Sequence, residues 1–231
     1  MHKIKIVIPA SGVGARLGGD VPKQFLPIDG KPILKRTLEA FNNCGFVDEI
    51  AVAVPEEYIA RVEEYGLNQV AHVVKGLAER SDSVYAALKA LQPFDGVVLV
   101  HDGIRFFVSE ALIRSVAIAA YEHGAAVAGV PMVETVKKVD GAGFVLDTPD
   151  RGQLWRAQTP QGFKYDLLIR AYEQAAADGV LCHATDDSAL VERLGHPVRM
   201  VQGDLWNMKI TSPMDYHLAQ ALYMAKDKLE S

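Results

Sequence analysis

Short apolar runs alternate with helix-like patterns along most of this 231-residue chain, and this alternation constrains its fold more strongly than any other feature. Five runs bounded by turn residues predict strands over residues 3–10, 49–55, 71–76, 96–102 and 125–131. Such alternation is typical of a mostly parallel sheet covered by helices on both faces, because parallel strands need crossover connections. The sequence therefore predicts an α/β fold, in which ligands bind outside the carboxyl ends of the strands.

Two of the expected helices carry clear signals. Residues 81–91 repeat apolar side chains at helical spacing, and Ser81 or Asp82 is expected to cap this helix. The segment "SPMDYHLAQALYMAKDKL" predicts a helix with Ser212 as its N-cap and Pro213 at its first position.

Some conspicuous side chains are expected to be structural. Trp155 and Trp206 are predicted to be core residues, and His101 is predicted to pack or hydrogen-bond within the protein. Asp186 and Asp187 have the pattern of a capped helix start, so they are expected to lie outside any functional site.

Composition narrows the classes of protein. The length suits a single domain, 1–231, and the formal net charge of −5 argues against a binder of nucleic acid or anionic membrane. Cys44 and Cys182 lack the spacing of a zinc site or a disulfide framework. The N-terminus has no signal-peptide pattern, and charged residues interrupt the most apolar stretch, 111–133, so a cytoplasmic protein is expected.

The segment "IPASGVGARLGGDVPKQF", residues 8–25, has the appearance of a phosphate loop. It fails the Walker A pattern, because Asp20 and Val21 stand where Lys and Ser or Thr are required. It also fails the dinucleotide pattern, because Leu17 takes the place of the third glycine. The expected ligand is therefore anionic, but neither NAD nor a P-loop nucleotide.

Charged residues follow several of the predicted strands. Arg16 and Lys23 follow the first, Asp102 and Arg105 follow the fourth, and Lys209 is expected to emerge from another short strand late in the chain. The set is rich in cations and poor in bases or nucleophiles. Phosphoryl and nucleotidyl transfer depend mainly on positioning and charge neutralisation, so this set favours those reactions.

The chain resembles the 2-C-methyl-D-erythritol 4-phosphate cytidylyltransferase family of the non-mevalonate isoprenoid pathway. The resemblance extends over nearly the whole length, through the ordered segments "PASGVGAR", "PKQF", "GLAERSDSV", "VLVHDGIR", "PMVETVKK", "LWRAQTPQGF", "TDDSALVE" and "GDLWNMKIT". It implies a Rossmann-like αβα nucleotidyltransferase domain with a protruding β-hairpin arm. It also implies an enzyme that joins CTP to a methylerythritol phosphate with Mg²⁺ and releases pyrophosphate.

The resemblance also implies roles for individual residues. Charge stabilisation in catalysis is expected from Arg16, Lys23 and Lys209. Nucleotide contacts are expected from Pro9, Ala10, Ser11, Gly12, Gly14, Gly76, Ser83, Asp102 and Gly103. Binding of the sugar phosphate is expected from Arg105, Thr135, Arg151 and Thr159, and Asp102 is the expected ligand of Mg²⁺.

The chain departs from the usual family pattern at a few places. Ser11 stands where Ala is frequent, Leu77 replaces the second Gly of a pair, and Glu134 replaces Asp. "HDGIRFF" replaces a more usual H-D-A-A-R-P, which changes the backbone that follows Asp102. None of these changes removes a residue that the chemistry requires.

Two other functions compete with this one. A ribitol 5-phosphate cytidylyltransferase would share the CTP half of the site and differ in the acceptor. A catalytically silent nucleotide-binding module is disfavoured, because binding alone would not require Arg16, Lys23, Asp102 and Lys209 together.

The strand–helix rhythm stops between residues 133 and 155. "TVKKV" and "GFVLDT" predict a hairpin that turns around Asp140 and Gly141. An isolated hairpin is only marginally stable, so this one requires a surface to pack on. A flap over its own domain is one possibility; the resemblance favours a dimerisation arm, residues 134–154, that reaches a second copy and forms a homodimer.

Overall fold

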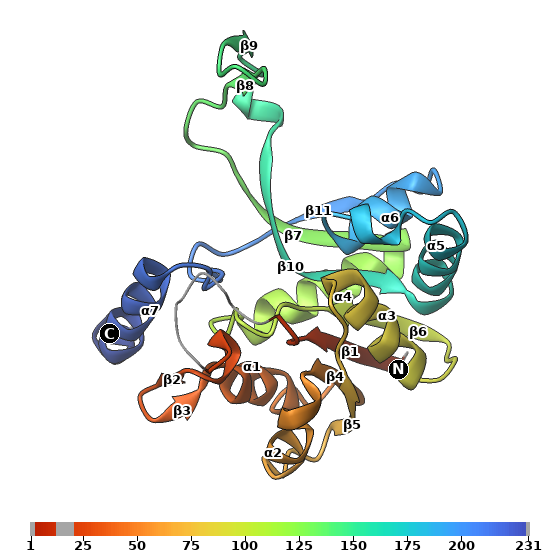
Figure 1. The fold of residues 1–231 in the computed structure, drawn as a ribbon, viewed down its shortest axis with the longest axis vertical. Helices are drawn as coiled ribbons and strands as arrows, with labels where there is room; N and C mark the ends of the chain where they lie inside the picture. Colours follow the sequence, from red (N-terminus) through yellow and green to blue (C-terminus); the bar gives the residue numbers. More distant parts are fainter. Residues whose placement is uncertain (1–2, 13–20, 230–231) are drawn as a thin grey trace.

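A seven-stranded sheet forms the centre of the protein, whose computed structural model describes residues 3–12 and 21–229 (Figure 1). Its strands are β1 (Lys3–Pro9), β4 (Glu49–Val54), β5 (Val70–Lys75), β6 (Gly96–Val100), β7 (Ala125–Pro131), β10 (Trp155–Lys164) and β11 (Arg199–Gln202). The order across the sheet is β11-β7-β10-β6-β1-β4-β5. Strand β10 is antiparallel to both of its neighbours, and the other pairs are parallel. All five predicted strands are present, and the predicted mostly parallel α/β fold is confirmed.

Helices cover both faces of this sheet. One face carries α1 (Ile33–Asn42), α2 (Ile59–Glu63) and α4 (Glu110–His123), and the other carries α3 (Arg80–Ala90), α5 (Tyr165–Ala177) and α6 (Asp187–Arg193). Strand β1 contributes side chains to the hydrophobic cores on both faces of the sheet. Ile6 and Ile8 belong to one core and Val7 to the other, and all three are fully buried, because side chains alternate between the faces of a strand.

A third, smaller core attaches the last helix, α7 (Pro213–Leu229), to a short hairpin of β2 (Pro27–Ile28) and β3 (Lys31–Pro32). The N-terminus of α7 is a capping box: the Asp215 N–H donates to Ser212 Oγ at 3.2 Å, and the Ser212 N–H donates to Asp215 Oδ2 at 2.8 Å. The prediction of Ser212 as N-cap is therefore confirmed.

Three local predictions are wrong. Helix α3 begins at Arg80, after an extended Glu79 with no side-chain cap bond, so Ser81 and Asp82 lie inside its first turn. Trp155 and Trp206 are each 38% exposed and lie outside the core. Lys209 follows an irregular segment after β11, without the short strand that was expected to carry it.

The most apolar stretch of the sequence is divided between two elements of this fold. Residues 111–133 contain most of α4, whose side chains pack into the core, and all of β7, which is a strand of the sheet. No helix in the described ranges is long and apolar enough to cross a membrane.

The connection between β7 and β10 projects from the body of the protein as an arm (Figure 1). Its tip is a hairpin of β8 (Lys138–Val139) and β9 (Val145–Asp147), which is shorter than the predicted strands. The loop runs from Asp140 to Phe144, and the residue with left-handed backbone is Gly143, at φ 86°, not Gly141. The predicted hairpin around Asp140 and Gly141 is confirmed, with a loop longer than that dipeptide, in which Asp140 Oδ1 accepts from the N–H groups of Ala142 and Phe144.

Candidate active site

A pocket of about 180 Å³ lies at the carboxyl ends of β1 and β6. The described residues that line it are Pro9, Ala10, Ser11, Gly12, Lys23, Gln24, Ala78, Arg80, Asp102, Ile104 and Lys209. The structure thus brings together seven of the residues predicted from sequence: Pro9, Ala10, Ser11, Gly12, Lys23, Asp102 and Lys209. This is the edge of the sheet where α/β proteins bind ligands.

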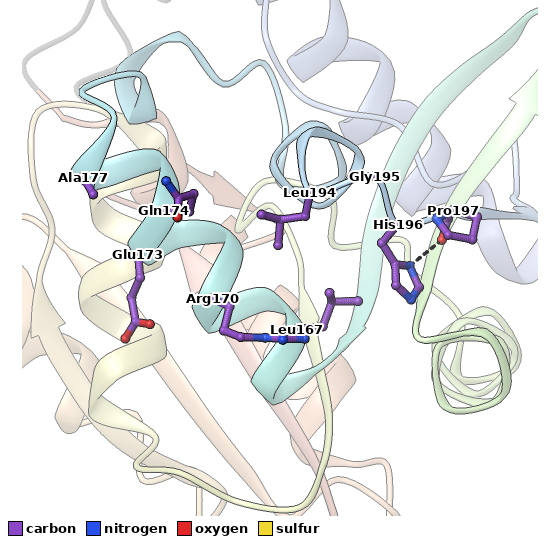
Figure 2. A pocket seen from close by; sticks show the side chains of 9 residues that line it. All are labelled: Leu167, Arg170, Glu173, Gln174, Ala177, Leu194, Gly195, His196 and Pro197. Atoms are coloured by element: carbon purple, nitrogen blue, oxygen red, sulfur yellow. Dashed lines mark hydrogen bonds between the residues drawn. The ribbon is translucent and has the colours of Figure 1, made fainter.

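A larger groove, of about 700 Å³, lies elsewhere, between α5 and the connection from α6 to β11 (Figure 2). Arg170 and Glu173 line it from α5, and His196 lines it from the opposite side, where its Nδ1 lies 2.8 Å from the Pro197 carbonyl oxygen. None of the described residues around this groove is a predicted site residue. Size alone would select this groove, but its side chains form no cluster suited to phosphate chemistry.

The chain leaves β1 in a conformation held by its neighbours. The Ala10 N–H donates to the Ala53 carbonyl oxygen at 2.7 Å, and Gln24 Nε2 donates to the Ala10 carbonyl oxygen at 2.6 Å. Gln24 is 1% exposed and lies in the single turn of 3-10 helix that also carries Lys23. Sequence reasoning missed Gln24, which fixes this part of the pocket wall.

Two serine hydroxyls connect the end of β1 to the loop before α3. Ser11 Oγ lies 2.7 Å from Ser83 Oγ, and Ser83 Oγ accepts from the Leu77 N–H at 2.8 Å. Gly76 packs against the same place, because a Cβ built on it would lie 2.1 Å from the Ser11 Cβ. Of the predicted nucleotide-binding residues, Ser11 therefore contacts both Gly76 and Ser83.

The departure at Gly103 has a steric explanation. A Cβ at this position would lie 3.0 Å from both the Ala10 Cβ and the Leu34 Cδ1, which is closer than side chains normally approach. The Gly103 N–H donates to the Pro9 carbonyl oxygen at 3.4 Å. Glycine therefore lets the chain after β6 pack directly beneath the end of β1.

Asp102 is the centre of charge in the pocket. Arg80 Nε lies 3.1 Å from its Oδ1, whereas Lys209 Nζ and Arg105 Nε lie 3.0 Å and 3.3 Å from its Oδ2. The Asp102 side chain is 8% exposed, and that of Lys209 is 38% exposed. Burial alone would raise the pKa of Asp102, but the charges of Arg80, Lys209 and Arg105 outweigh it and hold the pKa well below its usual range. Asp102 is therefore a carboxylate at any physiological pH.

Arg80 connects this carboxylate to a second buried acid. Its Nη2 lies 2.8 Å from Oδ2 of Asp187, which is fully buried at the start of α6. Sequence reasoning missed Arg80 and placed Asp187 outside the site. No sequence signal could have found this contact, because the sequence placed the start of α3 at Ser81 or Asp82; once the structure shows Arg80 as its first residue, the unfavourable helix dipole explains why it lies between two acids. The expected capping role of Asp186 is confirmed, since its Oδ1 accepts from the Ala189 N–H at 3.0 Å.

Two predicted acceptor-binding residues lie beneath the pocket rather than on its described lining. The Asp102 N–H donates to Thr159 Oγ1 at 3.1 Å, and that hydroxyl also lies 3.1 Å from His101 Nδ1. Arg105 Nη1 donates to the Asn207 carbonyl oxygen at 2.8 Å. The expected structural role of His101 is confirmed, because the ring is fully buried and its Nε2 lies 3.0 Å from the Arg105 carbonyl oxygen.

Other predicted residues lie away from the pocket or outside the described part of the chain. Thr135 and Arg151 are exposed on the arm, where Arg151 Nη1 donates to the Val133 carbonyl oxygen at 2.9 Å. Gly14 and Arg16 lie outside the described residues.

The acidic residues in and around the pocket indicate what kind of metal site it can form. The described residues contain no group of three or more His, Cys, Asp or Glu side chains suited to a metal ion. Asp102 is the single acidic residue among those described as lining the pocket. One carboxylate suits Mg²⁺ that arrives with substrate phosphates and keeps several waters, and it does not suit a metal bound by protein ligands alone.

A sheet covered on both faces, with lysines and one aspartate around a glycine-containing segment at its carboxyl edge, defines a nucleotidyltransferase class of enzyme. The family model for IspD, 2-C-methyl-D-erythritol 4-phosphate cytidylyltransferase, matches residues 4–225. The chain belongs to this family and is a cytidylyltransferase, as the sequence predicted.

Relatives support the same assignment over nearly their whole length. Proteins named 2-C-methyl-D-erythritol 4-phosphate cytidylyltransferase from Geotalea uraniireducens and Symbiobacterium thermophilum are 47% and 45% identical to the chain. Each comparison covers 95% of this chain, and they cover 96% and 92% of the two relatives.

Solved structures also match the fold over nearly the whole chain. The 4-diphosphocytidyl-2C-methyl-D-erythritol synthase from Anaerococcus prevotii has a TM-score of 0.84 at 30% identity, covering 96% of this chain and 99% of that one. The 2-C-methyl-D-erythritol 4-phosphate cytidylyltransferase from Thermus thermophilus has a TM-score of 0.76 at 35% identity, covering 95% and 98%. Each of these four relatives is named for methylerythritol chemistry, which favours that acceptor over ribitol phosphate.

Proposed function

We propose that the pocket binds CTP with Mg²⁺ and joins its cytidylyl group to the phosphate of 2-C-methyl-D-erythritol 4-phosphate. The observation that carries this proposal is the placement of Lys23 and Lys209 on the wall of one pocket with the buried Asp102 carboxylate. Family membership supplies the nucleotide and the acceptor.

The reaction requires little acid–base chemistry from the protein. A phosphate oxygen of the acceptor is already ionised, so it attacks the α-phosphorus of CTP without a general base. The new P–O bond gives 4-diphosphocytidyl-2-C-methyl-D-erythritol, and the bond from the α-phosphorus to the bridging oxygen breaks to release pyrophosphate. Lys23 and Lys209, with Arg16, neutralise the charge that accumulates on the reacting phosphates.

Asp102 would hold Mg²⁺ in this scheme, because it is the acid that faces the pocket among the described residues. When bound, Mg²⁺ supplies positive charge to the oxygens of the triphosphate. The triphosphate would supply most of the remaining ligands, in keeping with the single carboxylate.

The base and ribose would lie against the wall formed by residues 10–12 and 76–78. Ser11 and Ser83 hold these two segments together, and Gly76 allows them to approach closely. The exposed Leu77 lies at the rim of this wall, where the family usually has a glycine.

The acceptor half of the site is proposed to come from a second copy of the chain. Thr135 and Arg151 belong to the connection between β7 and β10, which projects from the body (Figure 1), and neither is among the described residues that line the pocket. The arm exposes large apolar side chains: Val133 at 75%, Val139 at 51%, Phe144 at 72%, Val145 at 58% and Leu146 at 60%. Exposed apolar surface of this kind is typical of an interaction site. A two-fold homodimer would cover the arm and complete both sites.

An acceptor screen tests the proposed reaction. The purified chain is mixed with CTP, Mg²⁺ and either methylerythritol phosphate or ribitol 5-phosphate, and pyrophosphate is measured. With methylerythritol phosphate, we expect the chain to release pyrophosphate and the Lys209→Ala variant, at the same protein concentration, to release it about 10²–10³ times more slowly. Release with ribitol 5-phosphate but not with methylerythritol phosphate would show that ribitol 5-phosphate is the acceptor. Release with neither acceptor would contradict the proposal.

Subunit mixing tests the shared site. Arg151→Ala leaves the pocket intact, and Lys23→Ala leaves the arm intact, so a heterodimer holds one complete site of two. Random pairing of equal amounts makes about half of the dimers heterodimers, which restores about a quarter of the parental activity. Absence of recovery, with heterodimers demonstrated by two affinity tags, would refute sharing. Full activity from a monomer would refute it as well.

A further inference from the structure

Arg80 joins two carboxylates that come from distant parts of the chain. Its Nε contacts Asp102 Oδ1 at 3.1 Å, and its Nη2 contacts Asp187 Oδ2 at 2.8 Å. Asp102 follows β6, whereas Asp187 begins α6. The guanidinium is planar and rigid, so contact with two acids fixes its plane and the positions of both acids.

Asp187 is a rigid anchor for this contact. Its Oδ1 accepts from the Tyr172 hydroxyl of α5, and its N–H donates to Gln161 Oε1 of β10 at 3.1 Å. Asp187 and Tyr172 are both fully buried. Arg80 therefore links Asp102, on the pocket wall, to the core around α5, α6 and β10.

At the other end, Arg80 contacts Oδ1 of Asp102, the carboxylate oxygen that Lys209 and Arg105 do not contact. Lys209 and Arg105 both contact Oδ2. A carboxylate held through one oxygen rotates easily, because the terminal torsion of aspartate is broad. Rotation of Asp102 would move Oδ2, and with it the ammonium group of Lys209.

We propose that Arg80 is a positioning residue: by clamping Oδ1 of Asp102 to the Asp187 anchor, it sets the orientation of the carboxylate and of Lys209 for cytidylyl transfer. This inference rests on the proposed function of the pocket. A purely structural ion pair would stabilise the fold equally well on any buried surface, but this one has its guanidinium on the pocket wall, with its side chain 31% exposed.

The test compares four variants of the full-length chain with the parent. Arg80→Met removes the charge and keeps the length of the side chain, and Arg80→Lys keeps one charge without the fork. Arg80→Met alone would leave the buried Asp187 carboxylate without its cation, which could unfold the protein. Arg80→Met combined with Asp187→Asn removes that charge as well, so the double variant is expected to fold. Arg193→Met is the matched control, because Arg193 forms a 2.7 Å ion pair with Asp178 on the surface of α6.

For each variant, kcat, KM for CTP, the Mg²⁺ concentration for half-maximal rate, Tm and the calorimetric affinity for Mg²⁺–CTP are measured. We expect the double variant to be folded, with kcat lowered about 10- to 100-fold and a raised requirement for Mg²⁺, as for residues that orient a metal ligand. Arg80→Lys should recover part of kcat, and Arg193→Met should match the parent in every kinetic quantity.

Two results would overturn the inference: a folded double variant with parental kcat and parental Mg²⁺ dependence, or equal losses in Arg193→Met. If the parent transfers no cytidylyl group to any acceptor, the proposed function fails, and the calorimetric affinities decide the role of Arg80 separately. Equal Mg²⁺–CTP affinity in the parent and the double variant would then count against Arg80.

Discussion

The pocket and the arm of this protein carry their charged and polar residues in opposite ways. In the pocket, Asp102 is buried and contacts three cations within 3.3 Å, so its position is determined by the protein itself. On the arm, Arg151 is exposed and bonds to a backbone carbonyl oxygen, and apolar side chains such as Phe144 face outward. The difference teaches that the described pocket residues are held in place by contacts within one chain, whereas the arm presents exposed side chains that, in the proposed function, a second copy would cover.

Removal of a pocket cation should have the largest effect. Lys209→Ala is expected to lower kcat by about 10²–10³, because the ammonium acts on charge that develops in the transition state. Tm should change little, since the Lys209 side chain is 38% exposed. Steady-state kinetics and thermal unfolding measure the two quantities, with Lys89→Ala on α3 as the control. A normal kcat in folded Lys209→Ala protein would remove Lys209 from the mechanism.

Removal of the arm cation should produce a different kinetic signature. Arg151→Ala is expected to raise KM for methylerythritol phosphate about 10- to 100-fold, since one hydrogen bond to a charged group contributes roughly 1.5–3 kcal/mol. KM for CTP should stay at the parental value, because the arm does not line the described pocket. An equal rise in KM for both substrates would contradict the division of labour between pocket and arm.

The same glycine-to-alanine change should distinguish the two regions in stability. In Gly76→Ala the new Cβ would lie 2.1 Å from the Ser11 Cβ, so the pocket wall must move, at a cost of about 1–3 kcal/mol. In Gly141→Ala the Cβ meets no described atom within 4 Å, and a change of less than about 0.5 kcal/mol is expected. Urea unfolding measures both changes. Equal stability of the two variants would show that the wall beside Ser11 is loosely packed.

The buried region beneath the pocket should also show in the pH dependence of stability. Burial lowers the pKa of His101 from 6.5 to about 4. Between these values the unfolded chain binds a proton that the folded chain does not, so stability is lost as pH falls from 6.5 toward 4. The loss between pH 7 and pH 5 is about 2 kcal/mol.

His101→Gln retains an amide donor and acceptor without a titrating ring, so it should flatten this slope in urea unfolding. An unchanged slope in the variant would assign the pH dependence to other groups. Carboxylates with lowered pKa values, such as Asp102 and Asp215, contribute stability that is lost mainly below their unfolded pKa values, so their effect falls mostly below pH 5.

Local patterns in the sequence determined much of the fold. The alternation of Ile6, Val7 and Ile8 decides which core each side chain enters, because the side chains of a strand alternate between its faces. The cap of α7 follows from Ser212 and Asp215, which are three residues apart. The meeting of Lys23 and Asp102 in one pocket was predictable, because both follow parallel strands and ligands bind parallel sheets at one edge; Lys209 reaches the same pocket from an irregular segment.

Tertiary structure alone decided the contacts between distant segments. Arg80 and Asp187 are 107 residues apart in the sequence; Asp187 is placed beside the pocket by its N–H bond to Gln161 of β10, which lies between β6 and β7 in the sheet. Trp155 and Trp206 are half-exposed for a similar reason, since burial depends on what packs against a side chain and not on its own hydrophobicity. Short-range patterns specify strands, caps and turns through neighbouring atoms, whereas an ion pair between distant segments or a covered surface depends on how the elements are arranged across the sheet.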